Sequence, residues 1–187
     1  MSEKGTDREK WDTPPGHFGS KTDEWSTPPE LLRSLEKAVG GFDLDPCSGA
    51  ERKSIAEQTY TAEDDGLKQA WFGTVWCNPP YSDMESWMQK AVNESNREDV
   101  DLVLVLAPAR TSTQWFHKYA TKADAVAFLE GRLTFGDPRE QVRNAPFPSI
   151  IAVFGEYPED LGDTLDRRGM VYRSDQRDQR TQQTVIA

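Results

Sequence analysis

Blocks of apolar and polar residues follow one another along this chain and predict strands and helices in turn. A continuous apolar run at 101–107 is typical of a strand buried on both faces of a parallel sheet. Apolar residues at helical spacing predict helices after Thr27, from Asp83 and around Trp115. Shorter apolar runs predict four more strands, at 42–45, 72–77, 125–129 and 149–154. Strands that alternate with helices indicate an α/β fold with a mostly parallel sheet.

Capping residues predict where two of these helices begin. Thr27 is expected to be the N-cap of the first helix, with Pro28 at the first helical position and Glu30 completing a capping box. Ser82 and Glu85 form a similar box ahead of the helix that starts near Asp83.

Composition divides the chain into three parts. Residues 1–24 are polar and irregular and are expected to form a flexible segment, whereas 25–157 carry the alternating pattern and form one domain. Within that domain, residues 50–70 are polar and loosely helical. The pattern fades after 157, so 158–187 are expected to be a polar, partly disordered tail.

A stiff turn, Asn78-Pro79-Pro80-Tyr81, follows the predicted strand 72–77. The Asn78 side-chain oxygen and the Pro79 carbonyl can accept the two N–H bonds of a ring amino group, while the prolines fix the backbone. Two such acceptors draw the amino nitrogen toward tetrahedral geometry, so that its lone pair becomes nucleophilic. Tyr81 offers a flat face on which a planar substrate can stack. Asn-Pro is also a common turn, so a purely structural role stays open for this motif taken alone.

Polar residues end two other segments. Asp45 ends the strand 42–45 before Pro46-Cys47, where its carboxylate could bind a cofactor or simply form an Asp-Pro turn. Asp64 and Asp65 precede a glycine, and aspartates in such turns are usually structural. Ligands of parallel α/β sheets bind at the carboxyl ends of the strands. Three pairs are therefore expected to face one crevice: Asp45-Pro46, Asn78-Pro79 and Pro108-Ala109.

Taken together, these motifs resemble those of the phage-type DNA N6-adenine methyltransferases, a Dam-like family. The resemblance covers roughly 23–155 and is specific as a set. It is carried by Thr27-Pro28-Pro29, Asp45-Pro46-Cys47-Ser48, Asp64-Asp65-Gly66-Leu67, Asn78-Pro79-Pro80-Tyr81-Ser82, Leu106-Ala107-Pro108-Ala109-Arg110, Trp115-Phe116-His117 and Gly131-Arg132-Leu133-Thr134-Phe135. It implies a phage or prophage enzyme that methylates N6 of adenine from S-adenosylmethionine, on a reduced Rossmann-like sheet with a terminal antiparallel strand.

The resemblance also implies roles for single residues. Thr27 and Pro28 would flank the methionine part of the cofactor, and Asp45 would hold its amino group beside Pro46 and Cys47. One of Asp64 and Asp65 would bind the cofactor's adenine. The motif Asn78, Pro79, Pro80 and Tyr81 would take the target adenine, flipped out of double-stranded DNA. One departure is that the glycine-rich loop of wider methyltransferases is reduced here to Ser48-Gly49-Ala50.

The net charge of −10 is unusual for a protein that binds DNA, because phosphate contacts favour Lys and Arg. Residues 110–143, however, hold six Lys or Arg against four acids, and 167–180 hold five Arg against two. A high-salt cytoplasm is one hypothesis for the acidic remainder. The expected DNA-binding residues are Arg110, Arg132, Arg139 and Arg143.

The remaining composition predicts a cytoplasmic monomer without a metal. No apolar run reaches the length of a membrane span, no signal peptide is evident, and the two histidines and two cysteines lack zinc-ligand spacing. Cys47 and Cys77 are expected to be reduced thiols at the ends of neighbouring strands. Two alternatives stay open: an N-methyltransferase of a protein glutamine or an rRNA guanine, and a non-catalytic DNA-binding relative.

Overall fold

A seven-stranded mixed sheet forms the centre of the computed structural model, which describes residues 27–49, 55–135, 143–145 and 147–174. Its spatial order is β2-β1-β3-β4-β8-β5-β9. The bounds are β1 Leu44–Asp45, β2 Gln58–Thr59, β3 Gly73–Cys77, β4 Val100–Pro108, β5 Ala125–Leu129, β8 Ser149–Gly155 and β9 Gly169–Arg173. A separate antiparallel pair is formed by β6 Thr134–Phe135 and β7 Arg143–Asn144.

The strand directions confirm the expected parallel core. Strands β2, β1, β3 and β4 run parallel to one another, whereas β8 is antiparallel to both β4 and β5. Strand β8, the last strand predicted from sequence, lies inside the sheet, and the sheet ends in an antiparallel strand, as expected. The edge is β9, which pairs antiparallel with β5.

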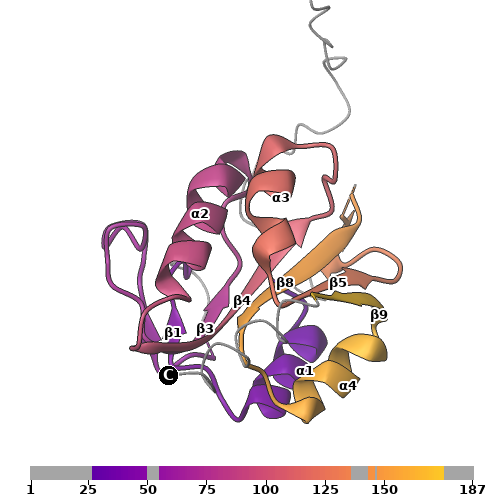
Figure 1. The fold of residues 1–187 in the computed structure, drawn as a ribbon, viewed down its shortest axis with the longest axis horizontal. Helices are drawn as coiled ribbons and strands as arrows, with labels where there is room; N and C mark the ends of the chain where they lie inside the picture. Colours follow the sequence, from indigo (N-terminus) through magenta and orange to yellow (C-terminus); the bar gives the residue numbers. More distant parts are fainter. Residues whose placement is uncertain (1–26, 50–54, 136–142, 146, 175–187) are drawn as a thin grey trace, which may run out of the picture.

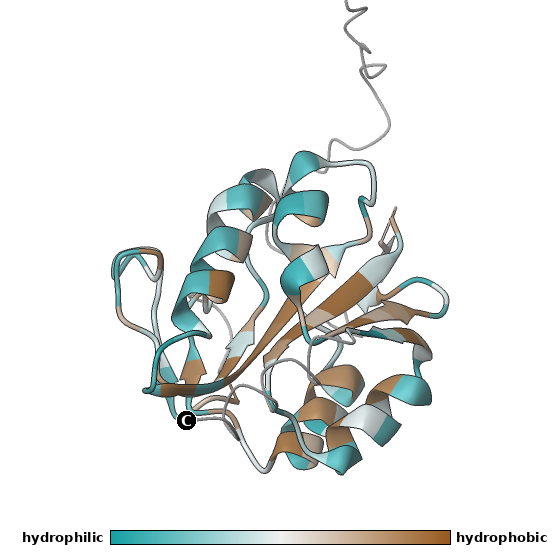
Figure 2. Ribbon diagram, viewed as in Figure 1, coloured by the Kyte–Doolittle hydropathy of each residue, from teal (hydrophilic) through white to brown (hydrophobic). Residues whose placement is uncertain are grey.

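Helices cover both faces of the sheet (Figure 1). Helices α2 (Met84–Glu94) and α3 (Gln114–Lys118) lie on one face, and α1 (Pro29–Val39) and α4 (Glu159–Asp166) pack together on the other. The 3₁₀ turns η1 (Tyr81–Asp83) and η2 (Ala120–Lys122) precede α2 and follow α3. The central strands are largely hydrophobic, as Figure 2 shows, and most of their residues are buried between the helices on the two faces.

Both predicted capping boxes are absent. The residue that precedes α1 is Pro28, no side chain caps the helix, and the Thr27 hydroxyl is used elsewhere. The 3₁₀ turn η1 leads directly into helix α2, whose N-cap is Asp83. No side chain caps this helix either, because η1 already turns the chain before the helix begins. The far end of α1 follows the expected rule: Gly40 ends it in the left-handed conformation, at φ 82°.

Two segments differ from the sequence expectation. Between 55 and 70 the chain forms β2 and a series of turns instead of a helix, because Gln58 and Thr59 pair with β1. After 158, α4 and β9 extend the fold well into the segment expected to be a polar tail. Leu161 and Leu165 of α4 are buried. The pattern of β9 is weak because Met170 and Tyr172 are exposed.

Within the described ranges, no helix is long and apolar enough to cross a membrane.

Candidate functional site

The carboxyl ends of four strands meet at one edge of the sheet. Because β1, β3 and β4 are parallel, and β5 runs in the same direction as β4 on the far side of β8, the residues that follow these strands gather there. Asp45, Asn78, Pro108 and Leu129 lie at or directly after these ends. The strand ends predicted from sequence to lie together are thus at one edge of the sheet, and this edge brings together segments far apart in the chain.

Asn78 lies between two hydroxyl groups. Its Nδ2 donates to Thr27 Oγ1 at 3.2 Å, and its Oδ1 accepts a hydrogen bond from the Tyr81 hydroxyl at 3.1 Å. Thr27, which is only 7% exposed, reaches Asn78 across 51 residues of sequence. The carboxamide is therefore held at both ends, by the entry to α1 and by η1.

Tyr81 does not present an open stacking face. The side chain is 5% exposed, and its ring packs edge-on against Phe147, with ring centroids 5.5 Å apart. Burial raises the pKa of the Tyr81 phenol above its usual range, so the hydroxyl stays protonated and can donate to Asn78. A base that stacks on this ring has to displace neighbouring atoms first. Phe147 itself gave no sequence signal, since it lies in an irregular segment.

The loop after β1 contacts the strand that carries Asn78. Asp45, half-buried, accepts at Oδ1 the backbone N–H of Cys47, at 3.1 Å. The Sγ atoms of Cys47 and Cys77 are 3.6 Å apart and both thiols are free, at neighbouring strand ends as predicted. Burial, and next the neighbouring Cys77, raise the pKa of Cys47 well above its ordinary value, which keeps it a thiol and unreactive.

The turn that contains Asp64 and Asp65 packs against this loop. A β-carbon built on Gly66 would overlap the carbonyl oxygen of Pro46, so the close approach requires glycine. Asp64 Oδ2 accepts the backbone N–H and the hydroxyl of Thr61, each at 2.8 Å, and these bonds lower its pKa. Asp65, at φ 55°, forms an ion pair with Lys68 at 2.6 Å. Both carboxylates thus have local partners, as the structural alternative predicted.

The predicted DNA-binding arginines are only partly described. Arg110 follows β4 close enough to Tyr81 for its charge to act on that phenol's pKa. Arg132 is exposed, and its Nη1 donates to the carbonyl of Ala145 at 3.1 Å. Arg143 belongs to β7 by its backbone, and Arg139 lies outside the described residues.

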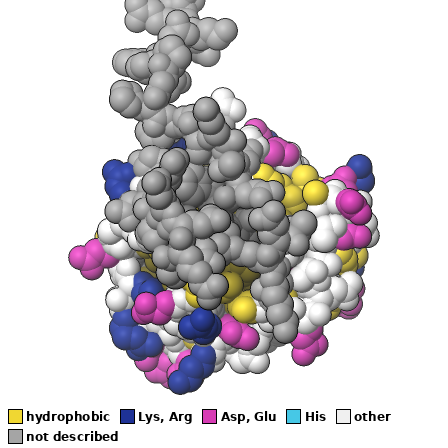
Figure 3. Space-filling view, turned by 180° about the vertical axis from the view of Figure 1, so that it is seen from behind, with side chains coloured by type: hydrophobic (Ala, Val, Ile, Leu, Met, Phe, Trp, Pro, Cys, Tyr) yellow, Lys and Arg dark blue, Asp and Glu magenta, His cyan; other side chains and the backbone are white. Residues whose placement is uncertain are grey.

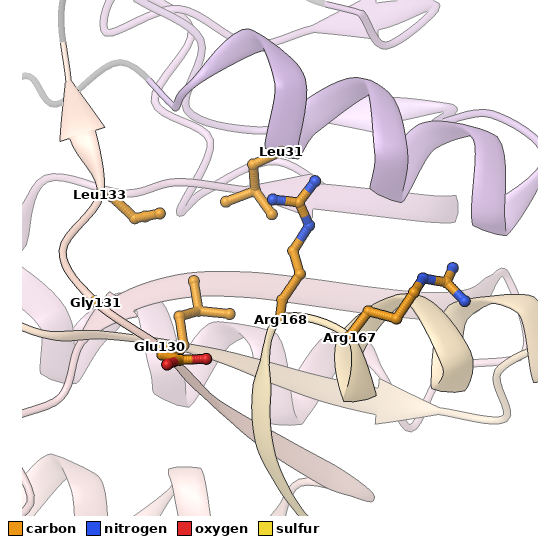
Figure 4. A pocket seen from close by; sticks show the side chains of 7 residues that line it. Leu31, Glu130, Gly131, Leu133, Arg167 and Arg168 are labelled. Carbon is orange, nitrogen blue, oxygen red and sulfur yellow. The ribbon is translucent and has the colours of Figure 1, made fainter.

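A cavity of about 290 Å³ lies between α1 and the end of β5 (Figure 4). It is lined by Leu31, Leu129, Glu130, Gly131, Leu133, Arg167 and Arg168. Arg168 reaches toward α1, where its Nη2 donates to the Ser34 hydroxyl at 3.0 Å. On the described surface visible in Figure 3, basic and acidic side chains are interspersed, without a large field of one sign.

No group of three or more His, Cys, Asp or Glu side chains that could hold a metal ion occurs among the described residues.

Fold and site define a class of protein: an α/β protein with an Asn-Pro-Pro-Tyr turn at the carboxyl edge of a parallel core. The chain belongs to the family described as DNA N-6-adenine-methyltransferase (Dam), whose sequence model matches residues 16–183. This confirms the resemblance inferred from the motifs.

Two phage proteins, each described as a DNA N-6-adenine-methyltransferase, are similar to this chain. The protein of Escherichia phage T1 is 36% identical over 116 residues, which are 60% of this chain and 47% of that protein. The protein of Haemophilus phage HP1 is 26% identical over 140 residues, which are 72% of this chain and 80% of that protein. The chain therefore matches about half of the length of the first relative and most of the second.

A solved structure, of a proposed RNA methyltransferase from Pyrococcus horikoshii, matches with a TM-score of 0.36 and 15% identity, over 55% of this chain and 52% of that one. A likeness this low carries no argument about function.

Proposed function

We propose that this chain transfers a methyl group from S-adenosylmethionine to N6 of adenine in DNA. Membership of the Dam family supports the reaction class. The observation that carries the proposal is the placement of Asn78, whose carboxamide is held by two hydroxyls at the carboxyl edge beside the β1 loop. Methyl transfer to an exocyclic nitrogen requires a fixed hydrogen-bond acceptor for the amino group beside the cofactor, and Asn78 next to the β1 loop offers this arrangement.

The proposed chemistry rests on pre-organised acceptors. Asn78 Oδ1 and the Pro79 carbonyl accept the two N–H bonds of the adenine amino group and stabilise the positive charge that develops on N6. An amide oxygen has two lone pairs, so Oδ1 can accept from substrate while Tyr81 donates to it. The bond from the methyl carbon to N6 would form as its bond to the sulfonium sulfur breaks, with the neutral thioether S-adenosylhomocysteine as the leaving group. N6 then loses one proton to water and returns to neutrality. Inside a duplex N6 is inaccessible, so the adenine has to be flipped out.

The cofactor-binding residues are proposed from the β1 side of the site. S-adenosylmethionine supplies an electrophilic methyl on its sulfonium. Asp45, at the end of β1, has the charge to hold the cofactor's ammonium group, and Pro46 and Cys47 form the adjoining loop. Gly66 brings Asp64 and Asp65 against that loop, in keeping with a contact to the cofactor's adenine. Thr27 and Pro28 close the site from the start of α1.

DNA is proposed to lie across the same edge. Arg110 follows β4 at this edge, and Arg132 lies beyond β5 in the segment that leads to the β6–β7 hairpin. Arg139 and Arg143 belong to the same basic segment of the sequence, 110–143.

The test is expression in a bacterial host without adenine methylation, followed by sequencing for N6-methyladenine. The native chain is expected to produce methylated adenine in a defined sequence context, and Asn78→Ala is expected to produce none. Titration calorimetry should show that Asn78→Ala keeps its affinity for S-adenosylmethionine within about threefold, because, of the two substrates, Asn78 is proposed to contact only the target base.

Other outcomes separate the alternatives. Cofactor binding with no methylated adenine, but with methyl transfer to protein glutamine or rRNA guanine, would replace the substrate assignment. Absence of cofactor binding together with retained DNA binding would identify a non-catalytic relative. Near-native adenine methylation by Asn78→Ala would refute the central role of the motif.

A further inference from the structure

The side chain of Thr27, which precedes α1, does not cap the helix but contacts Asn78. Thr27 lies one residue before Pro28, which is the N-cap of α1, and no side chain caps this helix. Instead Oγ1 accepts from Asn78 Nδ2 at 3.2 Å, in a place where the Thr27 side chain is 7% exposed. The start of α1 thus has no side-chain cap, while the Thr27 hydroxyl contacts Asn78, directly after β3.

The carboxamide of Asn78 has a demanding task in the proposed reaction. Its oxygen must point at an amino group, and the plane of the amide must match the direction of that group's N–H bond. The barrier to turning a terminal amide is low, because such torsions are broad. If the amide is turned the wrong way, its own N–H groups face the N–H groups of the substrate. Two donors then face each other and no hydrogen bond can form.

Two hydroxyls from opposite sides constrain that rotation. Tyr81 donates to Oδ1 from η1, and Thr27 accepts from Nδ2 at the start of α1. Neither hydroxyl alone selects the oxygen, since each can donate or accept. Together they hold the amide plane at both ends, and the bond from Nδ2 to Thr27 also polarises the amide toward a more negative oxygen.

We propose that Thr27 is a positioning residue for methyl transfer, acting through Asn78 on the acceptor that receives the adenine amino group. This inference rests on the proposed function and refines it: in addition to its place beside the cofactor, Thr27 fixes the geometry of the acceptor. The entry of α1, on one face of the sheet, thereby becomes part of the target-base site.

The test compares Thr27→Val, which keeps the branched shape but loses the hydroxyl, with Thr27→Ser, which keeps the hydroxyl. With saturating S-adenosylmethionine, the single-turnover rate of adenine methylation should fall at least about tenfold in Thr27→Val, the range in which small misplacements of reacting groups act. Thr27→Ser should restore the rate to within about threefold of wild type. Cofactor affinity by calorimetry should change less than the rate in both variants.

Two kinetic outcomes would overturn the inference. A wild-type rate in Thr27→Val means that the hydroxyl does not position the acceptor. A large loss of cofactor affinity, with a normal rate at saturation, means that Thr27 acts only on the cofactor.

A second readout does not need activity, and it separates this inference from the proposed function. The side-chain NH₂ signals of Asn78 in a ¹⁵N–¹H spectrum, identified by their loss in Asn78→Ala, should shift in Thr27→Val and stay near their wild-type positions in Thr27→Ser. Signals that do not move in Thr27→Val would refute the contact itself. Shifted signals in a protein that methylates no adenine would leave the contact standing while the proposed function failed.

Discussion

Single side chains hold this site together by joining segments that are distant in sequence. Asn78 joins β3 to the start of α1, and Glu94 joins the end of α2 to the segment before β3. Glu94 is 6% exposed; it accepts the backbone N–H of Trp71 at 2.9 Å and pairs with Lys90 and Arg97. At the scale of single residues, the sequence predicts which side chains have the right chemistry for the site, such as the Asn78 carboxamide that can accept hydrogen bonds. Their partners depend on distances that only the folded chain sets.

Asp45→Asn is expected to weaken the binding of S-adenosylmethionine at least about tenfold while changing the melting temperature little. The asparagine keeps an oxygen that can accept the Cys47 N–H but removes the charge proposed to hold the cofactor's ammonium group. Calorimetric titration measures the affinity. Asp101→Asn, an exposed change at the opposite end of β4, serves as the matched control and should bind normally. Unchanged affinity with a large loss of thermal stability would show that Asp45 is structural.

Glu94→Gln is expected to lower the free energy of unfolding by about 1–3 kcal/mol at neutral pH, because it removes a buried charge from two cationic partners. Burial opposes the charge of Glu94, but the bonds from Lys90 and Trp71 outweigh it and lower its pKa. The stabilisation is therefore present above the unfolded pKa and is lost as pH falls through the folded pKa. Urea unfolding at several pH values should show the gap between wild type and variant closing in acid.

The control for this experiment is Glu85→Gln. Glu85 pairs with Lys118 at the surface, where both side chains are more than half exposed. An exposed pair of this kind contributes at most about 1 kcal/mol. If the two variants lose equal stability, the buried network around Glu94 is not a special source of stability.

At the scale of elements, the close approach of two loops shapes the site: the turn around Gly66 and the loop after β1. The turn after Thr61 docks on the β1 loop only because Gly66 lacks a side chain. Sequence reasoning located the strands with continuous apolar runs, such as β4 and β5, since a strand buried on both faces has few polar positions. It missed β2 because that strand is only two residues long. It missed β9 because Met170 and Tyr172 are exposed, so the strand lacks a continuous buried run.

Gly66→Ala is expected to weaken cofactor binding and lower stability together, because the new methyl group has to push the Pro46 carbonyl away. Calorimetry and thermal unfolding measure the two effects. Gly162→Ala, in α4 and away from the β1 loop, is the control, since a β-carbon at Gly162 would make only ordinary contacts at 3.7 Å. An alanine at 66 that leaves both affinity and melting temperature unchanged would show that the two loops can separate without consequence for the site.

The whole molecule depends on its C-terminal elements as well as on the predicted domain. Helix α4 packs on α1, which leads into the site, and β9 covers the edge of β5. Arg168 adds a link, donating to Ser34 of α1. The polar appearance of this region hid these contacts, because only one side of α4 is buried.

Removal of residues 158–187 is expected to abolish cooperative unfolding, because α1 loses its packing partner and β5 gains an unpaired edge. Circular dichroism during heating is the measurement. A chain that ends at Ser174 keeps every described strand and helix, and it should unfold as a single transition. Equal behaviour of the two truncations would mean that α4 and β9 are dispensable.

Because the molecule carries a net charge of −10, DNA binding is expected to depend on its few basic residues near the site. Arg110→Gln and Arg132→Gln should each weaken DNA binding and reduce the slope of log affinity against log salt by about one, if each contacts one phosphate. Lys37→Gln, an exposed change in the last turn of α1, should leave the slope unchanged. Equal effects of all three changes, across a salt series, would show that no local DNA face exists.

The position of β8 between β4 and β5 has a consequence for synthesis on the ribosome. Strands β4 and β5 leave the ribosome first, yet neither pairs with the other in the finished sheet, since both pair with β8. Until residues 149–155 emerge, two apolar strands expose unpaired backbone groups and invite wrong partners. The nascent chain therefore has to leave these strand edges unpaired, or be shielded by a chaperone, until β8 has emerged.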